Sequence, residues 1–197
     1  MSSSGARQSR LPRLAVFISG AGRTLMNLQA RCADGSLPAE IVLVVASRDC
    51  PGAAWARHQG IHTRVIVPNT ITPASLTALL EELRISHVVL AGYLHLLPIP
   101  KGWERRIVNI HPALLPAFGG PGMHGRHVHE AVLAAGAKRS GATVHFCSDQ
   151  YDQGPIIDQA SCEVLPDDTP ETLAARVFAV ELELYPRALA TLLSGAS

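Results

Sequence analysis

The first half of the chain alternates short apolar runs with helical patterns, and no other feature of the sequence limits the fold as much. Each apolar run is followed by a glycine, proline or polar turn, and then in most cases by a segment with helix signals. This alternation is typical of a parallel sheet whose strands are joined by helices and buried on both faces. The predicted fold class is therefore α/β. At 197 residues, the chain has the length of one such domain.

The same alternation places the expected elements along the chain. Strands are expected at residues 14–18, 41–46, 63–67, 88–91 and 107–110, and helices at residues 25–33, 53–59 and 73–83. The second half is expected to hold a helix at 128–135, a strand pair at 142–146 and 155–157, and a last amphipathic helix. Thr169 is the expected cap of this helix, which should run to residue 193 with an interruption at Pro186, because proline lacks the helical N–H donor.

Composition argues against several classes of protein. The chain is 47% hydrophobic and 17% charged, and its net charge of +1 gives no electrostatic reason to expect binding to nucleic acid or to a membrane. The four cysteines show no C-x-x-C pairing and no disulfide-like spacing, so we expect reduced thiols and a cytoplasmic protein. Residues 1–12 are expected to be a disordered N-terminus, with an organellar targeting peptide as the alternative, and the domain should span residues 13–197.

A glycine turn, Ser19-Gly20-Ala21-Gly22-Arg23-Thr24, follows the first expected strand and precedes the first helix. Free backbone N–H groups at a helix start attract anions, and glycines let a phosphate approach closely. We therefore expect residues 20–24 to bind a substrate phosphate, although the stretch is neither a complete G-x-G-x-x-G nor a P-loop. The alternative is a tight turn with a purely structural role.

A second polar group lies where the fifth expected strand ends. Asn109 and His111 are two residues apart, so their side chains point the same way in an extended segment, and Pro112 then fixes the turn. A downstream turn offers two carboxylates for the same place, Asp149 and Asp152. Such a set suits acyl transfer to an amine: the amide stabilises an oxyanion, the imidazole handles a proton, and the carboxylate raises the imidazole pKa. The alternative is a strand end and a turn without a catalytic role.

The other histidines fit this chemistry less well. His124, His127 and His129 cluster, but the loop lacks a cysteine or carboxylate at the spacing of a fourth ligand, so no metal is expected. His145 lies in an apolar strand and is expected to be a packed histidine of the core or of a cleft wall.

Together these residues resemble the folate-dependent formyltransferases. The matching segments run in family order from about residue 14 to residue 186. They are Ile18-Ser19-Gly20, Val88-Val89-Leu90-Ala91-Gly92-Tyr93, Asn109-Ile110-His111-Pro112-Ala113-Leu114-Leu115-Pro116, Val128-His129-Glu130-Ala131, Thr143-Val144-His145-Phe146 and Tyr151-Asp152-Gln153-Gly154-Pro155-Ile156-Ile157. The combination of Asn-Ile-His-Pro-x-Leu-Leu-Pro with Asp-x-Gly-Pro is highly specific.

The resemblance implies a fold, a reaction and a set of site residues. The fold is a Rossmann-like, mostly parallel sheet with helices on both faces, in a single domain. The reaction is formyl transfer from 10-formyltetrahydrofolate to the amine of glycinamide ribonucleotide, without a metal. The resemblance makes Asn109, His111 and Asp152 the catalytic residues, which selects Asp152 over Asp149. It further implies Pro112 and Glu181 at the substrate amine and ribose, residues 20–24 at its phosphate, and Leu94, His95, Leu96, Leu97 and Asp152 at the folate.

Small molecules are thus the expected partners, with no nucleic acid and no membrane, and the protein is expected to be a monomer or homodimer. Three other functions stay open at this point. The acceptor can be another amine such as an amino-sugar nucleotide, the reaction can be deformylation, or the chain can be a catalytically silent folate- or nucleotide-binding homologue.

Two departures from the family pattern affect binding residues. The usual Gly-x-Gly-Ser-Asn-Leu-Gln is replaced by Gly22-Arg23-Thr24-Leu25-Met26-Asn27-Leu28-Gln29, so either Thr24 or Asn27 is the counterpart of the family's asparagine. The arginine usual after the folate-pocket Met or Leu is His95 in this chain. Neither departure touches the three catalytic positions.

Overall fold

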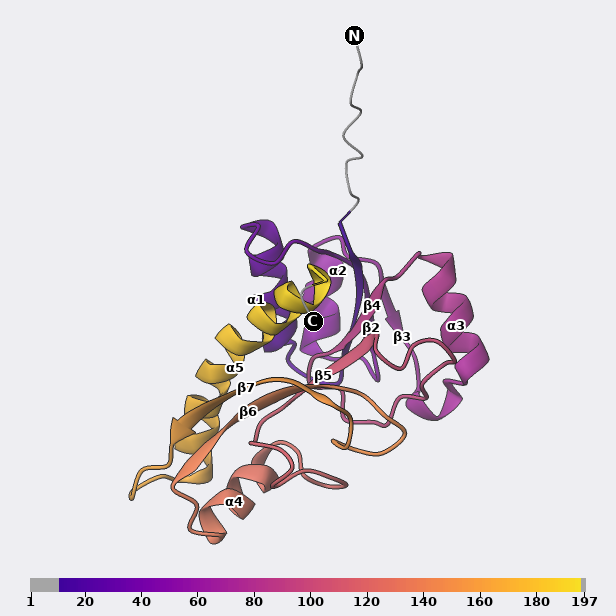
Figure 1. The fold of residues 1–197 in the computed structure, drawn as a ribbon. Coiled ribbons are helices and arrows are strands. Elements are labelled where there is room, and N and C mark those ends of the chain that lie inside the picture. Colours follow the sequence, from indigo (N-terminus) through magenta and orange to yellow (C-terminus); the bar gives the residue numbers. More distant parts are fainter. Residues whose placement is uncertain (1–10, 196–197) are drawn as a thin grey trace.

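The computed structural model describes residues 11–195, which form a sheet of seven strands with helices packed against it (Figure 1). The strands are β1 (Arg13–Ile18), β2 (Glu40–Ala46), β3 (Thr63–Val65), β4 (His87–Leu90), β5 (Ile107–His111), β6 (Arg139–Phe146) and β7 (Ile156–Glu163). The helices are α1 (Arg23–Ala33), α2 (Pro51–His58), α3 (Pro73–Glu82), α4 (Arg126–Ala134) and α5 (Pro170–Leu193), with a short 3-10 turn, η1, at Pro68–Thr70.

The strand order is β3-β2-β1-β4-β5-β6-β7, with parallel pairing from β3 through β5 and antiparallel pairing of β6 and β7. The predicted α/β class and the Rossmann-like, mostly parallel sheet are confirmed. Every expected helix and strand is present. The chief difference in length concerns β6 and β7, which extend well beyond residues 142–146 and 155–157. Strand β7 lies at the edge of the sheet, so polar residues alternate along it and the sequence shows no apolar run there.

Both faces of the central strands are buried, because neighbouring side chains of a strand point to opposite sides of the sheet. In β1, Leu14, Val16 and Ile18 join the apolar cluster formed with α1, α2 and α5. Ala15 and Phe17 join the second cluster, which includes α3. Figure 1 shows α1 and α5 on one side of the sheet and α3 on the other. This two-sided core holds the strand ends rigidly, and the loops that follow them can carry binding residues.

Helix α5 is tied to the sheet through Tyr185, whose side chain is fully buried. Its hydroxyl lies 3.0 Å from the carbonyl oxygen of Leu90 and 3.1 Å from that of Val108. One phenolic proton is thus shared between the last residue of β4 and the second residue of β5. Glu181 lies one helical turn before Tyr185 and on the same face of α5, so this anchor also brings Glu181 to the end of the sheet.

The predicted interruption of the last helix at Pro186 is wrong, because α5 continues through this residue to Leu193. Pro186 has no N–H to donate to the carbonyl oxygen of Leu182, four residues earlier. The side-chain amide of Asn27 in α1 donates to that oxygen instead, at 2.8 Å. The carbonyl freed by the proline is therefore satisfied by a neighbouring helix, and α5 does not have to end.

This exchange of donors predicts a coupling between Asn27 and Pro186. We expect Asn27→Ala to lower the free energy of unfolding by about 1–2 kcal/mol, because the Leu182 oxygen loses its donor in a partly buried position. In a Pro186→Ala background the same change should cost less than about 0.5 kcal/mol, because the backbone N–H restored at position 186 takes over the oxygen. Urea unfolding of the four proteins measures the coupling. Equal losses in both backgrounds would contradict it.

No helix within residues 11–195 is both long enough and apolar enough to cross a bilayer. The disorder predicted for residues 1–12 falls largely on residues 1–10, which lie outside the described residues, as do residues 196 and 197.

Candidate active site

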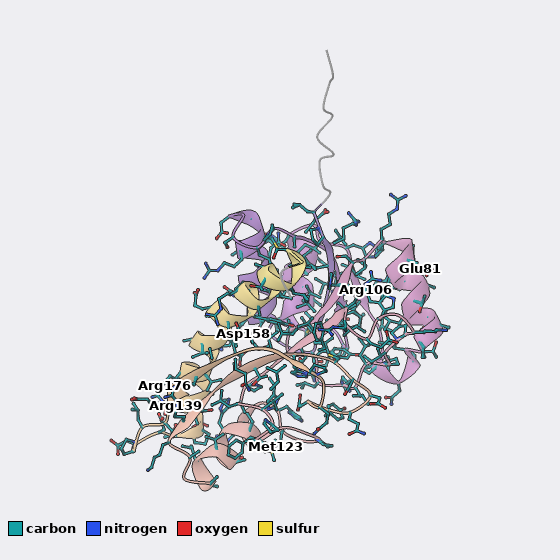
Figure 2. The ribbon with its side chains drawn as sticks, viewed as in Figure 1. Glu81, Arg106, Met123, Arg139, Asp158 and Arg176 are labelled. Atoms are coloured by element: carbon teal, nitrogen blue, oxygen red, sulfur yellow. The ribbon has the colours of Figure 1, made fainter. Side chains whose placement is uncertain are left out.

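The largest concentration of predicted site residues lies at the carboxyl ends of β1, β4 and β5. The strand order reverses between β1 and β4, and ligands of open α/β sheets bind at such a switch point. The loops after these strands, together with the turn after β6, border a main cleft of about 340 Å³. Met123, labelled in Figure 2, lies in the loop before α4 that forms one side of this cleft.

Asn109 and His111 point to the same side of β5, as the spacing predicts, and both line the main cleft. The alternate residue Val108 packs into the core beneath α5. Asn109 lies opposite His145 on the antiparallel neighbour β6, and its side-chain amide is 3.2 Å from Nε2 of that histidine. Nδ1 of His145 lies 2.9 Å from the carbonyl oxygen of Phe146, which fixes the ring with Nε2 toward the amide. The Asn109 amide is thus held in one orientation with its second N–H free.

Asp152 is the carboxylate that the structure brings to His111, whereas Asp149 is exposed to solvent. The Asp152 side chain is only 8% exposed, and its Oδ2 lies 3.4 Å from Nδ1 of His111. The same oxygen accepts a hydrogen bond from the backbone N–H of Gly120 at 3.0 Å. Oδ1 lies 3.5 Å from Nε2 of His145. One carboxylate therefore contacts both buried imidazoles and the loop over the cleft.

These contacts determine the charge of Asp152. Burial raises the pKa of its carboxyl group, but the contact with His145, the positive charge available at His111 and the Gly120 N–H together outweigh burial. The pKa of Asp152 therefore lies below its ordinary value, and the group is ionised at neutral pH.

The sequence argument that a carboxylate raises the pKa of His111 is only partly right. His111 is 3% exposed, and this burial lowers its pKa more than Asp152 and the Phe118 carbonyl raise it. The resting imidazole is therefore neutral at neutral pH. Nε2 lies 2.8 Å from the carbonyl oxygen of Phe118, and Nδ1 faces Asp152, so an acceptor stands beside each ring nitrogen. Negative charge developing in the cleft would consequently favour the protonated ring.

Three buried polar side chains hold the loops of the site in place. This role was not predicted from the sequence for any of them. They are His145, described above, Thr143 and Ser19. Thr143 donates to the carbonyl of Ala113 at 2.7 Å and accepts from the N–H of Leu115 at 3.0 Å, which fixes the turn after β5. Ser19 accepts from the N–H of Leu94 at 3.2 Å and from the hydroxyl of Ser47 at 2.9 Å. In each case, the sequence feature that could have indicated this role is a polar residue within or directly after an apolar strand.

The predicted phosphate loop divides into two parts. Thr24 lines the main cleft and Arg23 a second, adjoining cleft, whereas Gly20, Ala21 and Gly22 line neither. Gly22 has a φ of +75° and packs on the backbone of Gly52, where a Cβ would lie 2.7 Å from the Gly52 Cα. The glycine therefore has a structural reason that is independent of any ligand. Of the two residues that the sequence offers as the counterpart of the family's asparagine, Thr24 lines the main cleft and Asn27 donates to the carbonyl of Leu182.

The residues predicted for the folate lie along one wall. Leu94 lines the main cleft, and His95, Leu96 and Leu97 line a small hollow beside it together with Asn109 and Asp152. The N–H of Leu96 donates to the hydroxyl of Tyr151 at 3.0 Å, which joins this wall to the turn that carries Asp152. Leu94 and Leu96 stay 45% and 44% exposed, an apolar surface that suits a flat aromatic ring.

Pro112 and Glu181 lie where the main cleft meets the second cleft, whose volume is about 530 Å³. Burial raises the pKa of Glu181 to about 7, against the opposing effect of the positive charge of Arg23. Glu181 is thus able to exchange a proton near neutral pH.

The described residues contain no group of three His, Cys, Asp or Glu side chains arranged to hold a metal ion. His124 and His127 are exposed, with ring centroids 6.0 Å apart, whereas His129 is buried beneath the second cleft.

Comparison with known proteins identifies the family of the chain. The sequence profile of the formyl transferase family matches residues 12–189. The chain belongs to the formyl transferase family. It is 42% identical over 189 residues to the chloroplastic phosphoribosylglycinamide formyltransferase of Arabidopsis thaliana, covering 91% of this chain and 65% of the relative. The chain thus spans less than two thirds of the length of this relative.

Solved structures of family members share the fold. Glycinamide ribonucleotide transformylase 1 from Symbiobacterium toebii superposes with a TM-score of 0.87 at 35% identity, covering 98% of this chain and 94% of that one. Phosphoribosylglycinamide formyltransferase from Brucella melitensis superposes with a TM-score of 0.81 at 40% identity, covering 94% and 97%. The fold implied by the sequence resemblance is confirmed over nearly the whole chain.

The raised pKa of Glu181 predicts how stability depends on pH. The unfolded chain releases this proton near pH 4.5 and the folded chain near pH 7, so between these values the folded state binds more protons. Its contribution to the free energy of unfolding therefore falls as the pH rises through this window, and the loss is complete above pH 7. Glu181→Gln removes the free-energy cost of ionising this buried carboxyl group. We expect this variant to be more stable than wild type by about 1–2 kcal/mol at pH 8 and equal to it at pH 4, allowing for partial solvent screening.

Denaturant unfolding at the two pH values measures this difference. Glu183→Gln is the matched control, because it removes an exposed carboxylate from the same helix and breaks only a surface ion pair with Arg31. It should change stability by less than about 0.5 kcal/mol at either pH. A Glu181→Gln protein that is less stable than wild type at pH 8, or that keeps its advantage at pH 4, would contradict the prediction.

Proposed function

We propose that this protein transfers the formyl group of 10-formyltetrahydrofolate to the primary amine of glycinamide ribonucleotide. The products are the N-formyl ribonucleotide and tetrahydrofolate. The observation that carries the proposal is the convergence of Asn109, His111 and Asp152 at the floor of the main cleft, beside its junction with the second cleft. The phosphoribosylglycinamide formyltransferases among the relatives support this choice of acceptor.

The two clefts suggest one place for each substrate. The folate ring system would lie in the main cleft and the hollow beside it, against Leu94, Leu96 and the rest of that apolar wall. The acceptor would lie in the second cleft, with its amine between Pro112 and Glu181. The formyl carbon and the amine then meet over His111. The two small molecules account for the lining of both clefts without a nucleic-acid or membrane partner.

Each step of the transfer has a residue suited to it. The amine nitrogen attacks the formyl carbon, a C–N bond forms, and the carbonyl oxygen becomes an oxyanion. The free N–H of Asn109 donates to that oxygen, and protonated His111, with Asp152 behind it, stabilises its charge. Glu181, with a pKa of about 7, takes the proton lost by the attacking nitrogen. His111, which is neutral at rest, becomes protonated by taking up through Glu181 the proton that leaves the attacking nitrogen, and it delivers this proton to N10 of the folate as the old C–N bond breaks and the carbonyl re-forms.

The role of the carboxylate is tested by a pair of asparagine variants in one turn. We expect Asp152→Asn to lower kcat by about 10²–10⁴, because His111 loses the charge that stabilises its protonated form. Asp149→Asn is the matched control, since Asp149 is exposed in the same turn, and should keep kcat within about twofold. Absorbance of the deformylated folate product reports turnover, and thermal unfolding checks that both variants are folded.

His111→Ala and a choice of acceptors complete the test. His111→Ala should lose about as much activity as Asp152→Asn if the two groups act as one unit. Retained turnover in His111→Ala would refute the catalytic role. Turnover without any acceptor would indicate a deformylase, and turnover only with an amino-sugar nucleotide would replace the proposed acceptor. Folate binding without turnover on any amine would indicate a silent homologue.

A further inference from the structure

Arg23 has an unusual environment for an arginine at a cleft. It is the first residue of α1, and its guanidinium carbon lies 3.8 Å from the ring centroid of Phe178 in α5. Within residues 11–195 its side chain makes no hydrogen bond and no ion pair. Its positive charge lowers the pKa of Glu181, but the two described side chains form no ion pair. The stacking interaction therefore fixes the side chain while its N–H groups stay free.

The other basic groups of the second cleft are in a different state. Arg126 is bound to Glu130, with Nε 2.6 Å from the carboxylate, and also to Glu171, so its charge is compensated. His129 is 5% exposed, and its Nδ1 has no hydrogen-bond partner among the described residues. Burial lowers the pKa of His129, and the neighbouring His111 lowers it further, so it carries no charge at neutral pH. Among the described residues that line this cleft, Arg23 is thus the cation without a bound carboxylate.

The start of α1 adds a second reason to expect an anion at this place. The helix is 11 residues long, Gly22 is its N-cap, and no side chain caps it. Its first turn contains no acidic residue. Among the described residues, no side-chain cap and no first-turn acid therefore compensates the free N–H groups and the positive end of the helix dipole, and Arg23 itself belongs to this first turn.

We propose that Phe178 is a positioning residue that holds the guanidinium of Arg23 in the second cleft to bind the phosphate of the acceptor, so that this stacked pair determines the preference for a phosphorylated acceptor. The inference rests on the proposed function, because it assigns the acceptor to the second cleft. A guanidinium stacked on a ring keeps its N–H edge available for two parallel hydrogen bonds to phosphate oxygens. Holding it there in advance reduces the side-chain entropy lost on binding.

The position of the pair also orients the acceptor. Arg23 and Phe178 line only the second cleft, whereas Pro112 and Glu181 line both clefts. A phosphate on Arg23 would thus place the other end of the acceptor at Glu181 and direct its amine toward the main cleft. An acceptor without a phosphate would lose this orientation as well as affinity.

The test measures binding of ribose 5-phosphate by titration calorimetry, with ribose as the ligand that lacks the phosphate. Arg23→Met should weaken binding by about 10–100-fold, since it removes a charged hydrogen-bonding group. Phe178→Leu keeps an apolar side chain but removes the ring face, and should weaken binding by about 3–10-fold. The double variant should bind no more weakly than Arg23→Met alone, because Phe178 acts through Arg23.

Arg126→Met is the matched control. It removes the same charge from the same cleft, but the two carboxylates already compensate this charge, so the Kd should stay within about twofold of wild type. With the full reaction, Phe178→Leu should raise the KM for the phosphorylated acceptor by the same factor as the Kd and leave kcat within about twofold. The KM for the folate donor should not change. A merely structural loss would lower kcat and alter both KM values together.

The outcomes separate this inference from the proposed function. Binding of ribose 5-phosphate that does not depend on Arg23, equal losses in Arg126→Met, or no binding to wild type would overturn the inference, even for an active formyltransferase. Binding that depends on Arg23 in a protein unable to formylate glycinamide ribonucleotide would sustain the phosphate site and refute the proposed function.

Discussion

The arrangement of the site depends on the contacts made by the buried carboxylate of Asp152. It contacts His111 at the end of β5, His145 in β6 and the backbone of Gly120, which are far apart in the sequence. The turn that carries it is pressed against the end of β6, because a Cβ on Gly154 would lie 1.7 Å from the carbonyl oxygen of Phe146. Without this charge, two buried imidazoles would lose their common partner, and the loop over the cleft would lose an acceptor.

Helix α5 supplies three different functions from one face. Phe178, Glu181 and Tyr185 are three and four residues apart, so they follow one another along the same side of the helix. Tyr185 fixes the helix to the backbone of β4 and β5, Glu181 faces the junction of the clefts, and Phe178 stacks on Arg23. Because Tyr185 attaches the helix to the sheet, the sheet also determines where Phe178 and Glu181 lie.

The sequence predicts those features that depend on local periodicity. Alternating strands and helices predict the fold class, and the spacing of Asn109 and His111 predicts their shared side of β5. The sequence does not predict features that depend on contacts between residues far apart in the chain. The bond from Asn27 that lets α5 pass Pro186 joins positions 155 residues apart. The net pKa of His111 depends on how deeply the folded chain buries the ring, and its neighbouring carboxylate alone predicts the wrong direction. The importance of His145 follows from strand register, which residue types do not reveal.

The proline in α5 also has a consequence for the two helices that border the second cleft. Asn27 lies one helical turn after Arg23, and Leu182 directly follows Glu181, so the bond between them links the two walls close to the residues that line the cleft. In a regular helix the Leu182 oxygen would be occupied within α5, and α1 would have no such point of attachment. Because the chain lacks a backbone N–H at position 186, α5 keeps a free acceptor by which α1 is attached next to the cleft.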